Sequence, residues 1–396
     1  MIPIPTEILT LILNFVGERG FAGLVDWESL SSCSRVCRGW KPVAQAVLCK
    51  EQYLNLAHRP APCKRYIQFL RSSPSVAAFV RVLHIYYNDY PRYSSDEDPP
   101  LKPYLLFKIL RLLPRLHTLD VKDTFLAGWP WSSPLPRNPI RLRSLRLEAV
   151  RYHPRKARNC VPFDFLSLFE VDDLESSRNS LDQKGFSAPS LTRREPACFV
   201  VRELKVSRSD PFVSFNHKHG GLDCERIQRL CLKPLTAEDV SFHTSLVRRY
   251  GPHLSHLELK IDDVSALKKP GIVCPTFDIA SCLSLETLKL SYYCHRHKPT
   301  DERYSEVYRS ILAATSTSLR ELTFNIVLCF DSPEFCQFVA PMLAPVIVYA
   351  ATRFPELETI LLVVPDWALP DESVATMEEL LPENITKRGL VQFTFV

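Results

Sequence analysis

The chain has 396 residues, of which 46% are hydrophobic and 23% are charged, so its composition is that of a globular protein and excludes wholesale disorder. The net charge of +5 is mild, so it permits an acidic partner without requiring nucleic acid. With only 11 glycines, the sequence has no G-x-G-x-x-G, G-x-x-x-x-G-K-[ST] or G-x-S-x-G motif. Composition and motifs therefore give no support for a nucleotide-dependent enzyme or a serine hydrolase.

The cysteines and the hydropathy pattern bear on the cell compartment. The 13 cysteines are odd in number and contain no C-x-x-C, which is typical of reduced thiols. The first residues lack a basic stretch, so we expect no signal peptide. The apolar run at 338–352 contains Pro341 and Pro345 and is too short for a membrane span, so a buried helix is expected there. We expect a cytoplasmic and/or nuclear protein without a membrane partner.

The first 51 residues predict three short helices. Behind Pro5, apolar residues recur at i, i+3 and i+4 spacing, which indicates a helix with one apolar face. Further helices are expected to begin near Asp26 and Pro42. Helices of this length bury little surface by themselves, so the trio is either a docking module or the N-terminal cap of a larger domain.

Two stretches of this region carry a resemblance to a known family. Ile4-Pro5-Thr6-Glu7-Ile8-Leu9 opens the region, and Ser34-Arg35-Val36-Cys37-Arg38-Gly39-Trp40 closes it. Together they resemble the F-box motif, which usually opens with Leu-Pro-x-Glu-Ile-Leu and closes with Ser-x-Val-Cys-[Arg/Lys]-x-Trp. Ile4 replaces the usual leucine, and the loop at 17–26 is longer than usual. The resemblance covers only residues 1–52.

The resemblance implies that this region binds a Skp-type adaptor and, through it, a cullin-RING ligase. The residues that it implicates are Ile4, Pro5, Ile8, Leu9, Ile12, Leu30, Val36, Cys37 and Trp40. Each of them either packs the helices together or meets the adaptor, and the sequence does not divide these two roles. Trp40 is the expected anchor, because tryptophan is enriched at binding hot spots.

A short phrase recurs through the rest of the chain: an apolar residue, two variable residues, an apolar residue, one variable residue and an apolar residue. The middle apolar residues of its ten instances are Leu83, Leu119, Leu145, Leu204, Leu230, Leu257, Leu288, Leu322, Ile360 and Phe393. The gap after Leu145 is about double the others, and a degenerate unit at 171–174 is expected to fill it.

Helix-like stretches precede several phrases, as at 104–113 and 304–314, so each unit reads as helix, turn and strand. We predict an α/β fold in which the N-terminal three-helix F-box (1–52) and a helical connector (53–78) precede an irregular, leucine-rich-repeat-like solenoid with parallel strands (79–396). This part resembles the irregular leucine-rich repeats that often follow an F-box in fungi. The Asn or Cys that usually follows each strand is expected to be missing from every unit. The alternative is an ordinary α/β domain with parallel strands.

Strand alternation predicts which side chains face away from the core of the repeat domain. The middle of this set leans basic, with Arg146, Lys205, Lys233, Lys260 and Lys289. A row of like charges predicts an acidic or phosphorylated target. Asp120, Glu148 and Glu258 support the alternative, a solvated face of mixed charge.

No catalytic frame or cofactor motif is recognised, so we expect neither enzymatic activity nor a cofactor. Cys294, His295 and His297 lie close together without zinc-finger spacing, and we expect no metal site. The favoured function is the substrate-recognition subunit of an SCF-type E3 ubiquitin ligase, which binds an as yet undefined protein target. The alternatives are a non-degradative F-box scaffold, or a repeat protein that binds an anionic ligand. Nucleic acid is the least favoured partner.

Overall fold

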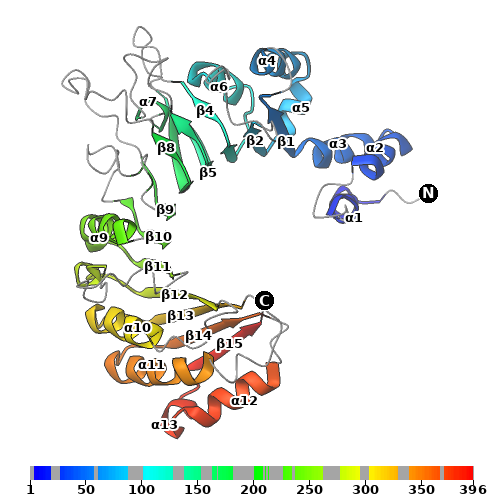
Figure 1. The fold of residues 1–396 in the computed structure, drawn as a ribbon. Coiled ribbons are helices and arrows are strands. Elements are labelled where there is room, and N and C mark those ends of the chain that lie inside the picture. The colour runs from blue at the N-terminus through cyan, green and yellow to red at the C-terminus, as the bar shows by residue number, and fades with distance from the viewer. Residues whose placement is uncertain are drawn as a thin grey trace, which may run out of the picture. The chain divides into compact units, whose positions relative to one another are not determined.

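The chain folds into two compact units, Met1–Val200 and Val201–Val396 (Figure 1). The computed structural model describes residues 4–18, 27–57, 61–87, 101–127, 138–152, 163–166, 168–181, 200–207, 210, 213, 226–233, 237–261, 277–294, 303–328, 339–365 and 370–395.

The first unit opens with the three predicted helices, α1 (Thr6–Glu18), α2 (Trp27–Val36) and α3 (Trp40–Cys49). Glu7 lies in the first turn of α1, where a carboxylate interacts favourably with the helix dipole. The turn into α3 is closed by the carbonyl of Cys37, which accepts bonds from the backbone N–H groups of Trp40 and Lys41, both at 3.2 Å. The three helices contact one another pairwise.

Five parallel strands follow the helices in the first unit, and each pairs with the next along the chain. They are β1 (Glu51–Asn55), β2 (Val82–Tyr86), β3 (Thr118–Lys122), β5 (Ile140–Glu148) and β7 (Phe169–Ser177). The helices between them are α4 (Pro62–Ser72), α5 (Pro74–Phe79), α6 (Pro103–Leu110) and α7 (Phe163–Leu166). The stretch predicted as a helical connector thus holds α4 and α5, but the sheet already begins at Glu51, earlier than expected.

Three successive repeats of the first unit turn in the same way after their strands, and we call this turn the corner. The strands β3, β5 and β7 each run into a two-residue strand, and these short strands pair in parallel as a second sheet. They are β4 (Phe125–Leu126), β6 (Arg151–Tyr152) and β8 (Ser180–Leu181). At each corner one non-glycine residue has positive φ: Asp123 at 47°, Ala149 at 51° and Arg178 at 55°. The left-handed conformation turns the chain where no glycine is available.

Asn179 stabilises this corner, and it corrects one prediction. Its buried side chain accepts a bond from the Val150 N–H (2.8 Å) and donates bonds to the Leu147 carbonyl (3.1 Å) and the Ser176 hydroxyl (2.9 Å). It lies two residues after β7, so the prediction that every unit lacks an asparagine at this place is wrong. The phrase in β7 is degenerate, with Ser176 at its last apolar position, and β7 is the degenerate unit predicted at 171–174.

The second unit contains seven further parallel strands, again paired in chain order. They are β9 (Glu203–Ser207), β10 (Arg229–Lys233), β11 (His256–Ile261), β12 (Thr287–Cys294), β13 (Glu321–Leu328), β14 (Thr359–Val364) and β15 (Val391–Phe395). Its helices are α9 (Ala237–Tyr250), α10 (Arg303–Ala314), α11 (Ala340–Arg353), α12 (Pro370–Leu380) and α13 (Glu383–Thr386), with 3₁₀ turns η6 (Gly251–His253) and η8 (Ile279–Ser281). α9, α10 and α11 lie on the same side of these strands (Figure 1). The predicted helix at 338–352 is α11, with Leu343, Val346 and Ile347 buried.

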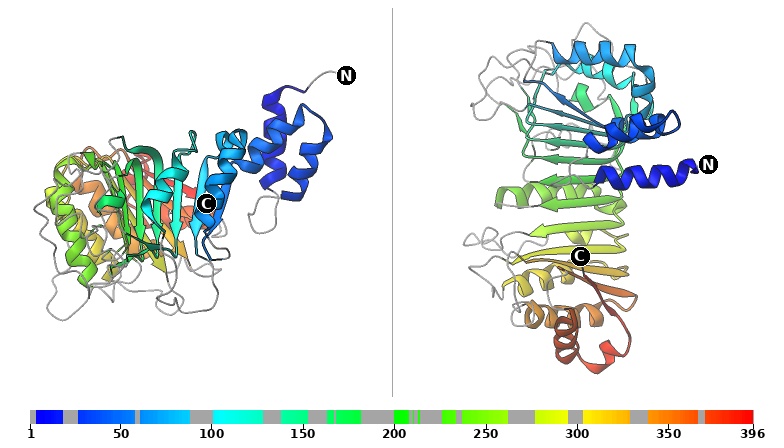
Figure 2. Two further views of the ribbon diagram at one scale, coloured as in Figure 1. Left: turned by 90° about the horizontal axis from the view of Figure 1, so that it is seen from above. Right: turned by 90° about the vertical axis from the view of Figure 1, so that its right-hand side faces the viewer.

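The recurring phrases lie in register. Leu83 pairs with Leu119 and Leu119 with Leu145, while in the second unit Leu257 pairs with Leu288. Within each unit the strands lie side by side in chain order (Figure 2), without the reversal of order found in doubly wound domains. The predicted α/β class with N-terminal helices and successive parallel strands is therefore confirmed. The last phrase is offset, because Phe393 pairs with Leu362 and not with Ile360.

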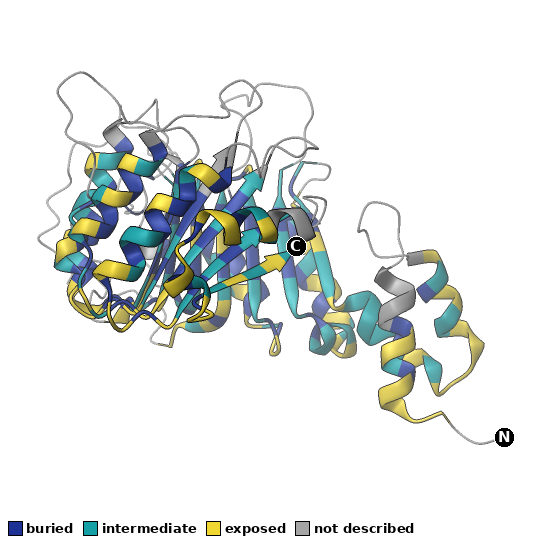
Figure 3. Ribbon diagram, turned by 90° about the horizontal axis from the view of Figure 1, so that it is seen from below, coloured by how far each residue is buried: buried dark blue, intermediate teal, exposed yellow. Residues whose placement is uncertain are grey.

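The phrase residues form the core of each sheet. The middle leucines of β2, β3, β5, β9, β11, β12 and β13 are all fully buried. Buried and more exposed residues alternate along the strands (Figure 3), as expected where only one sheet face is covered by helices. Apolar side chains are buried on the face that the helices cover, and polar side chains occupy the other face.

Candidate functional site

The three N-terminal helices have a small core of their own. Leu9 and Leu13 of α1, Leu30 of α2 and Ala44 of α3 are buried together. Cys33, Trp40, Val43, Val47 and Leu48 are partly buried and pack against them. The trio is thus held together by side chains from all three helices, and its remaining apolar residues are not needed for that purpose.

A second set of apolar residues, on α1 and just before it, is exposed. We call Ile8, Leu11 and Ile12 of α1, together with Ile4 two residues before the helix, the α1 stripe; the spacing of the three helical residues places them along one side of α1. Their exposed fractions lie between 41% and 65%, and Val36 at the end of α2 is 64% exposed. Among the described residues, nine large hydrophobic side chains are exposed, and these five account for more than half of them. Exposed apolar surface is therefore concentrated at the N-terminal helices.

The structure divides the nine residues implicated by the F-box resemblance into two groups. Leu9 and Leu30 are buried, and Trp40 packs half-buried against them. Six side chains face solvent: Ile4, Pro5, Ile8, Ile12, Val36 and Cys37. Leu11 was missed by the sequence reasoning, because apolar residues occur around most of α1 and their spacing does not show which of them are exposed. Whether the exposed group binds an adaptor stays a prediction.

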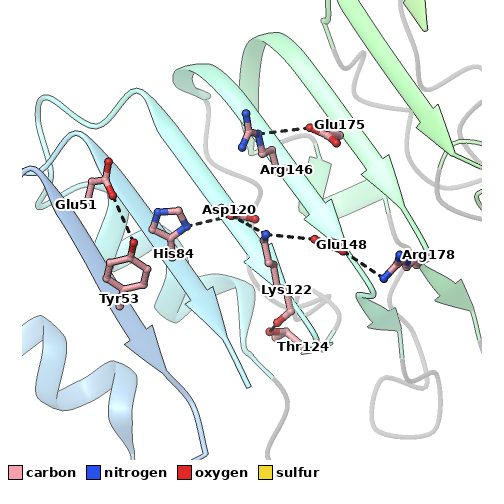
Figure 4. Close-up of polar contacts among 10 residues, drawn as sticks. All are labelled: Glu51, Tyr53, His84, Asp120, Lys122, Thr124, Arg146, Glu148, Glu175 and Arg178. Atoms are coloured by element: carbon pink, nitrogen blue, oxygen red, sulfur yellow. Dashed lines mark hydrogen bonds and ion pairs between the residues drawn. The ribbon is translucent and has the colours of Figure 1, made fainter. Parts of the chain in front are cut away.

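The polar sheet face of the first unit carries a connected set of charges across three strands (Figure 4). Asp120 Oδ2 lies 3.0 Å from His84 Nδ1 and 3.5 Å from Lys122 Nζ. Lys122 Nζ also lies 3.2 Å from Glu148 Oε2, and Glu148 Oε1 lies 3.6 Å from Arg178. Partial burial lowers the pKa of Lys122, but the two carboxylates more than offset this and raise its pKa overall.

Asp120 does not face solvent as the strand pattern predicted. It is 2% exposed, although it occupies a position on the polar face of β3. The neighbouring polar side chains on β2 and on β3 itself lean over it, since His84 and Lys122 both reach its carboxylate. Asp120 therefore pairs with the polar side chains of this face from below the surface. It cannot contact a macromolecular partner directly.

Aromatic side chains extend this face to the first strand. The Tyr53 ring stacks on His84, with 4.6 Å between ring centroids, and Tyr86 meets Tyr53 edge-on at 6.5 Å. The Tyr53 hydroxyl donates a bond to Glu51 Oε2 at 3.4 Å (Figure 4). The face at β1 and β2 is thus more aromatic than the sequence pattern had indicated.

The predicted row of cations is divided between the two units. Arg146 belongs to the first unit and lies 3.5 Å from Glu175. In the second unit Lys205 lies 2.8 Å from Glu203, while Lys260 and Lys289 lie 3.4 and 3.5 Å from Glu258. Lys233, at the end of β10, also has an interaction partner. Neighbouring carboxylates therefore offset much of the positive charge on which the acidic-target prediction rested, and the face is one of mixed charge.

One buried thiol and the possible metal ligands were candidates for chemistry at the described residues. Burial raises the pKa of Cys231 to about 12, so its thiol stays protonated at neutral pH and is a poor nucleophile. Within the described ranges, no three His, Cys, Asp or Glu side chains gather as metal ligands. His295 and His297 lie outside those ranges. No helix in the described part is long and apolar enough to cross a membrane.

Comparison with known proteins gives a weak structural match. No family model matches the chain, and no curated protein matches it. Among solved structures, the chain is similar to one in the crystal structure of the Rad7 and Elc1 complex in yeast. The identity is 13%, the TM-score is 0.30, and the match covers 99% of this chain and 93% of that chain. The fold of this chain consequently rests on its own strand pairing.

Proposed function

We propose that this chain is the substrate-recognition subunit of an SCF-type E3 ubiquitin ligase. The three N-terminal helices bind a Skp-type adaptor, and the parallel-sheet region binds a target protein. The observation that carries this proposal is the α1 stripe: a helical trio with a core of its own still exposes four aliphatic side chains, three on α1 and one just before it. Together with the F-box-like Val36-Cys37-Arg38-Gly39-Trp40 segment, the stripe favours docking over a purely structural cap.

Magnitudes indicate how large the adaptor contact must be. Fully burying an aliphatic side chain contributes roughly 1.5–3 kcal/mol. Because the stripe is already about half covered, burying the rest contributes on the order of 4 kcal/mol. Association costs are at least of the same size, roughly 4 kcal/mol or more. The stripe alone therefore does not give a stable complex, and the exposed Pro5, Val36 and Cys37 must add to the contact.

The receptor itself needs no catalytic group in this function. It holds the target close to a ubiquitin-loaded enzyme, which raises the effective concentration of the target's lysines. This agrees with a chain whose described polar groups form a mixed-charge surface and no acid–base or nucleophile frame.

The test is the double substitution Ile8→Asp/Leu11→Asp in the full chain. Each carboxylate would have to be buried against apolar adaptor helices without a partner, which costs several kcal/mol. We expect the wild type to co-elute with a Skp-type adaptor at micromolar concentration on size-exclusion chromatography and the variant to elute alone. Leu283→Asp is the matched control, since Leu283 is as exposed as Leu11 but lies in the second unit.

Substituting Trp40 or Leu30 would be a poorer test, because both pack in the trio and their loss disturbs the fold. If the wild type does not co-elute, or if the double variant co-elutes equally well, adaptor binding through the α1 stripe is wrong. Ubiquitin transfer to a captured target in a reconstituted ligase then separates a ligase receptor from a non-degradative scaffold.

A further inference from the structure

A groove runs between α4 and α6 of the first unit, two helices that pack against each other on the same side of the strands (Figure 1). Its volume is about 500 Å³, and it is open to solvent. Three cations line it, Lys64 and Arg71 from α4 and Lys108 from α6, and all three are exposed. The buried Ile67 lies at its base.

Among the described residues, no acid offsets the positive charge of this groove. Neither α4 nor α6 contains an acidic residue, and none of the described residues that line the groove carries a carboxylate. Throughout the described ranges, none of Lys64, Arg71 and Lys108 has an ion-pair partner within 4.0 Å. The sheet-face cations differ, since Lys205, Lys260 and Lys289 each have a carboxylate within 2.8–3.5 Å. The uncompensated positive charge therefore lies on the helical side of the first unit.

The side chains of the groove are suited to a peptide. Lys108 Nζ lies 5.7 Å from the centroid of the Tyr104 ring, so a cation–π contact holds this ammonium group at the edge of the groove. Ile67 and Leu105 offer apolar contacts between the cations. The cations of the groove surround an apolar base. This arrangement is complementary to an extended peptide whose acidic side chains alternate with less polar ones.

The length of the groove limits its ligand. With 11 residues in α4 and 8 in α6, the helices extend about 16 and 12 Å. That distance accommodates roughly four or five residues of an extended peptide. Duplex nucleic acid binds tightly only when many phosphates are neutralised along it, which three cations over this distance do not achieve.

We propose that the α4–α6 groove binds a short, extended, anionic segment of the target protein, through pairing of its carboxylates or phosphates with Lys64, Arg71 and Lys108. The inference rests on the proposed receptor function in calling the bound protein a target. The acidic or phosphorylated target, which the sequence predicted for the sheet face, is thereby assigned to the helical side of the first unit. Carboxylates and phosphoserine share the anionic oxygens that the groove recognises, and the experiment distinguishes them.

The experiment measures binding of short fluorescent peptides to the full chain by fluorescence anisotropy. One peptide is rich in Asp and Glu, the second has phosphoserine in their place, and the third has Asn and Gln. We expect both anionic peptides to bind, the phosphopeptide more tightly because of its greater charge, and the neutral peptide to bind at least about tenfold more weakly. Affinity for the anionic peptides should fall between about 50 and 200 mM salt, as screening increases.

Two sets of substitutions locate the site. In Lys64→Gln/Arg71→Gln/Lys108→Gln we expect affinity for the anionic peptides to fall about tenfold, with the circular dichroism spectrum unchanged, because all three residues are exposed. The matched control is Lys205→Gln/Lys260→Gln/Lys289→Gln on the sheet face of the second unit, which should leave peptide affinity unchanged.

Several results would contradict the binding of an anionic peptide in the α4–α6 groove. They are equal binding of the neutral peptide, no binding of either anionic peptide, loss of affinity in the sheet-face variant alone, or tighter groove-dependent binding of an oligonucleotide. The same proteins are tested for adaptor co-elution, where the groove variant should behave as the wild type. Lost peptide binding with intact co-elution rejects only the groove, whereas intact peptide binding without co-elution rejects only the receptor function.

Discussion

The N-terminal helices and the sheet of the first unit use apolar residues in opposite ways. In the sheet, the middle leucines of β2, β3 and β5 are fully buried under helices of the same chain. In α1, Leu9 and Leu13 are buried but Leu11 and Ile12, between them, are exposed. The sheet buries its apolar residues within the chain, whereas the helical trio leaves the α1 stripe exposed.

The difference teaches that apolar residues stabilise the sheet by burial, whereas those of the α1 stripe, under the proposed function, serve binding. A substitution in the sheet should act on the free energy of unfolding, and an equivalent substitution in the α1 stripe should act on association alone. Three experiments test this contrast, from the largest expected effect to the smallest.

The first compares Leu119→Ala in β3 with Leu11→Ala in α1. Leu119 is fully buried, so its truncation leaves a cavity and should cost about 2–5 kcal/mol of unfolding free energy. Leu11 is 65% exposed, so its truncation should change stability by less than about 0.5 kcal/mol. Urea unfolding followed by circular dichroism measures both. Equal costs at the two positions would contradict the contrast, because they would mean that the α1 stripe is part of a stabilising core.

The second is Asn179→Ala at the corner after β7. The substitution removes three hydrogen bonds and leaves the Val150 N–H and the Leu147 carbonyl without their side-chain partner. Such losses typically cost about 1–3 kcal/mol, which urea unfolding would resolve. Asn325→Ala is the control, since Asn325 is only half-buried on β13, and a change below about 0.5 kcal/mol is expected there. An unchanged stability in Asn179→Ala would show that the corner is held by the backbone alone.

The third compares the reactivity of two cysteines. It involves no substitution, so the stability of the protein is unchanged. Cys37, beside the F-box-like turn, is exposed, whereas Cys231 on β10 is buried and burial raises its pKa to about 12. Only the thiolate reacts with iodoacetamide, and at pH 8 it makes up on the order of 10⁻⁴ of Cys231. Mass spectrometry should therefore find Cys37 labelled long before Cys231.

A bound adaptor should slow the labelling of Cys37 and leave that of Cys231 unchanged. Comparable rates at the two thiols in the native chain would refute the assigned burial of Cys231. Fast labelling of Cys37 in a chain saturated with adaptor would place this residue outside the contact.

Much of the sheet was predictable because the pattern that buries a strand is local. The spacing of Leu116, Leu119 and Val121 fixes which residues point inward, and repetition of the spacing fixes the parallel register. The strand β1 was missed because it lies at the edge of the sheet, where Leu54 is its only buried residue. β1 thus carries too few apolar residues to show the recurring phrase.

The candidate sites were less predictable, because they depend on which segments meet. Apolar residues occur around most of α1, so no periodicity separates the buried Leu9 from the exposed Leu11. On the sheet, the pairing of Lys289 with Glu258 depends on cross-strand register. The α4–α6 groove joins residues that lie far apart in the chain, and only the packing of the two helices brings their cations together.

A single residue joins the helical trio to the sheet. Lys50 follows α3 directly and precedes β1, and its carbonyl accepts bonds from the Arg81 and Val82 N–H groups at 2.8 and 3.0 Å. The helical trio is therefore joined to the first strands of the sheet without a linker. Under the proposed function, the distance between a bound adaptor and these strands would be fixed by the trio itself, since only Lys50 separates α3 from β1.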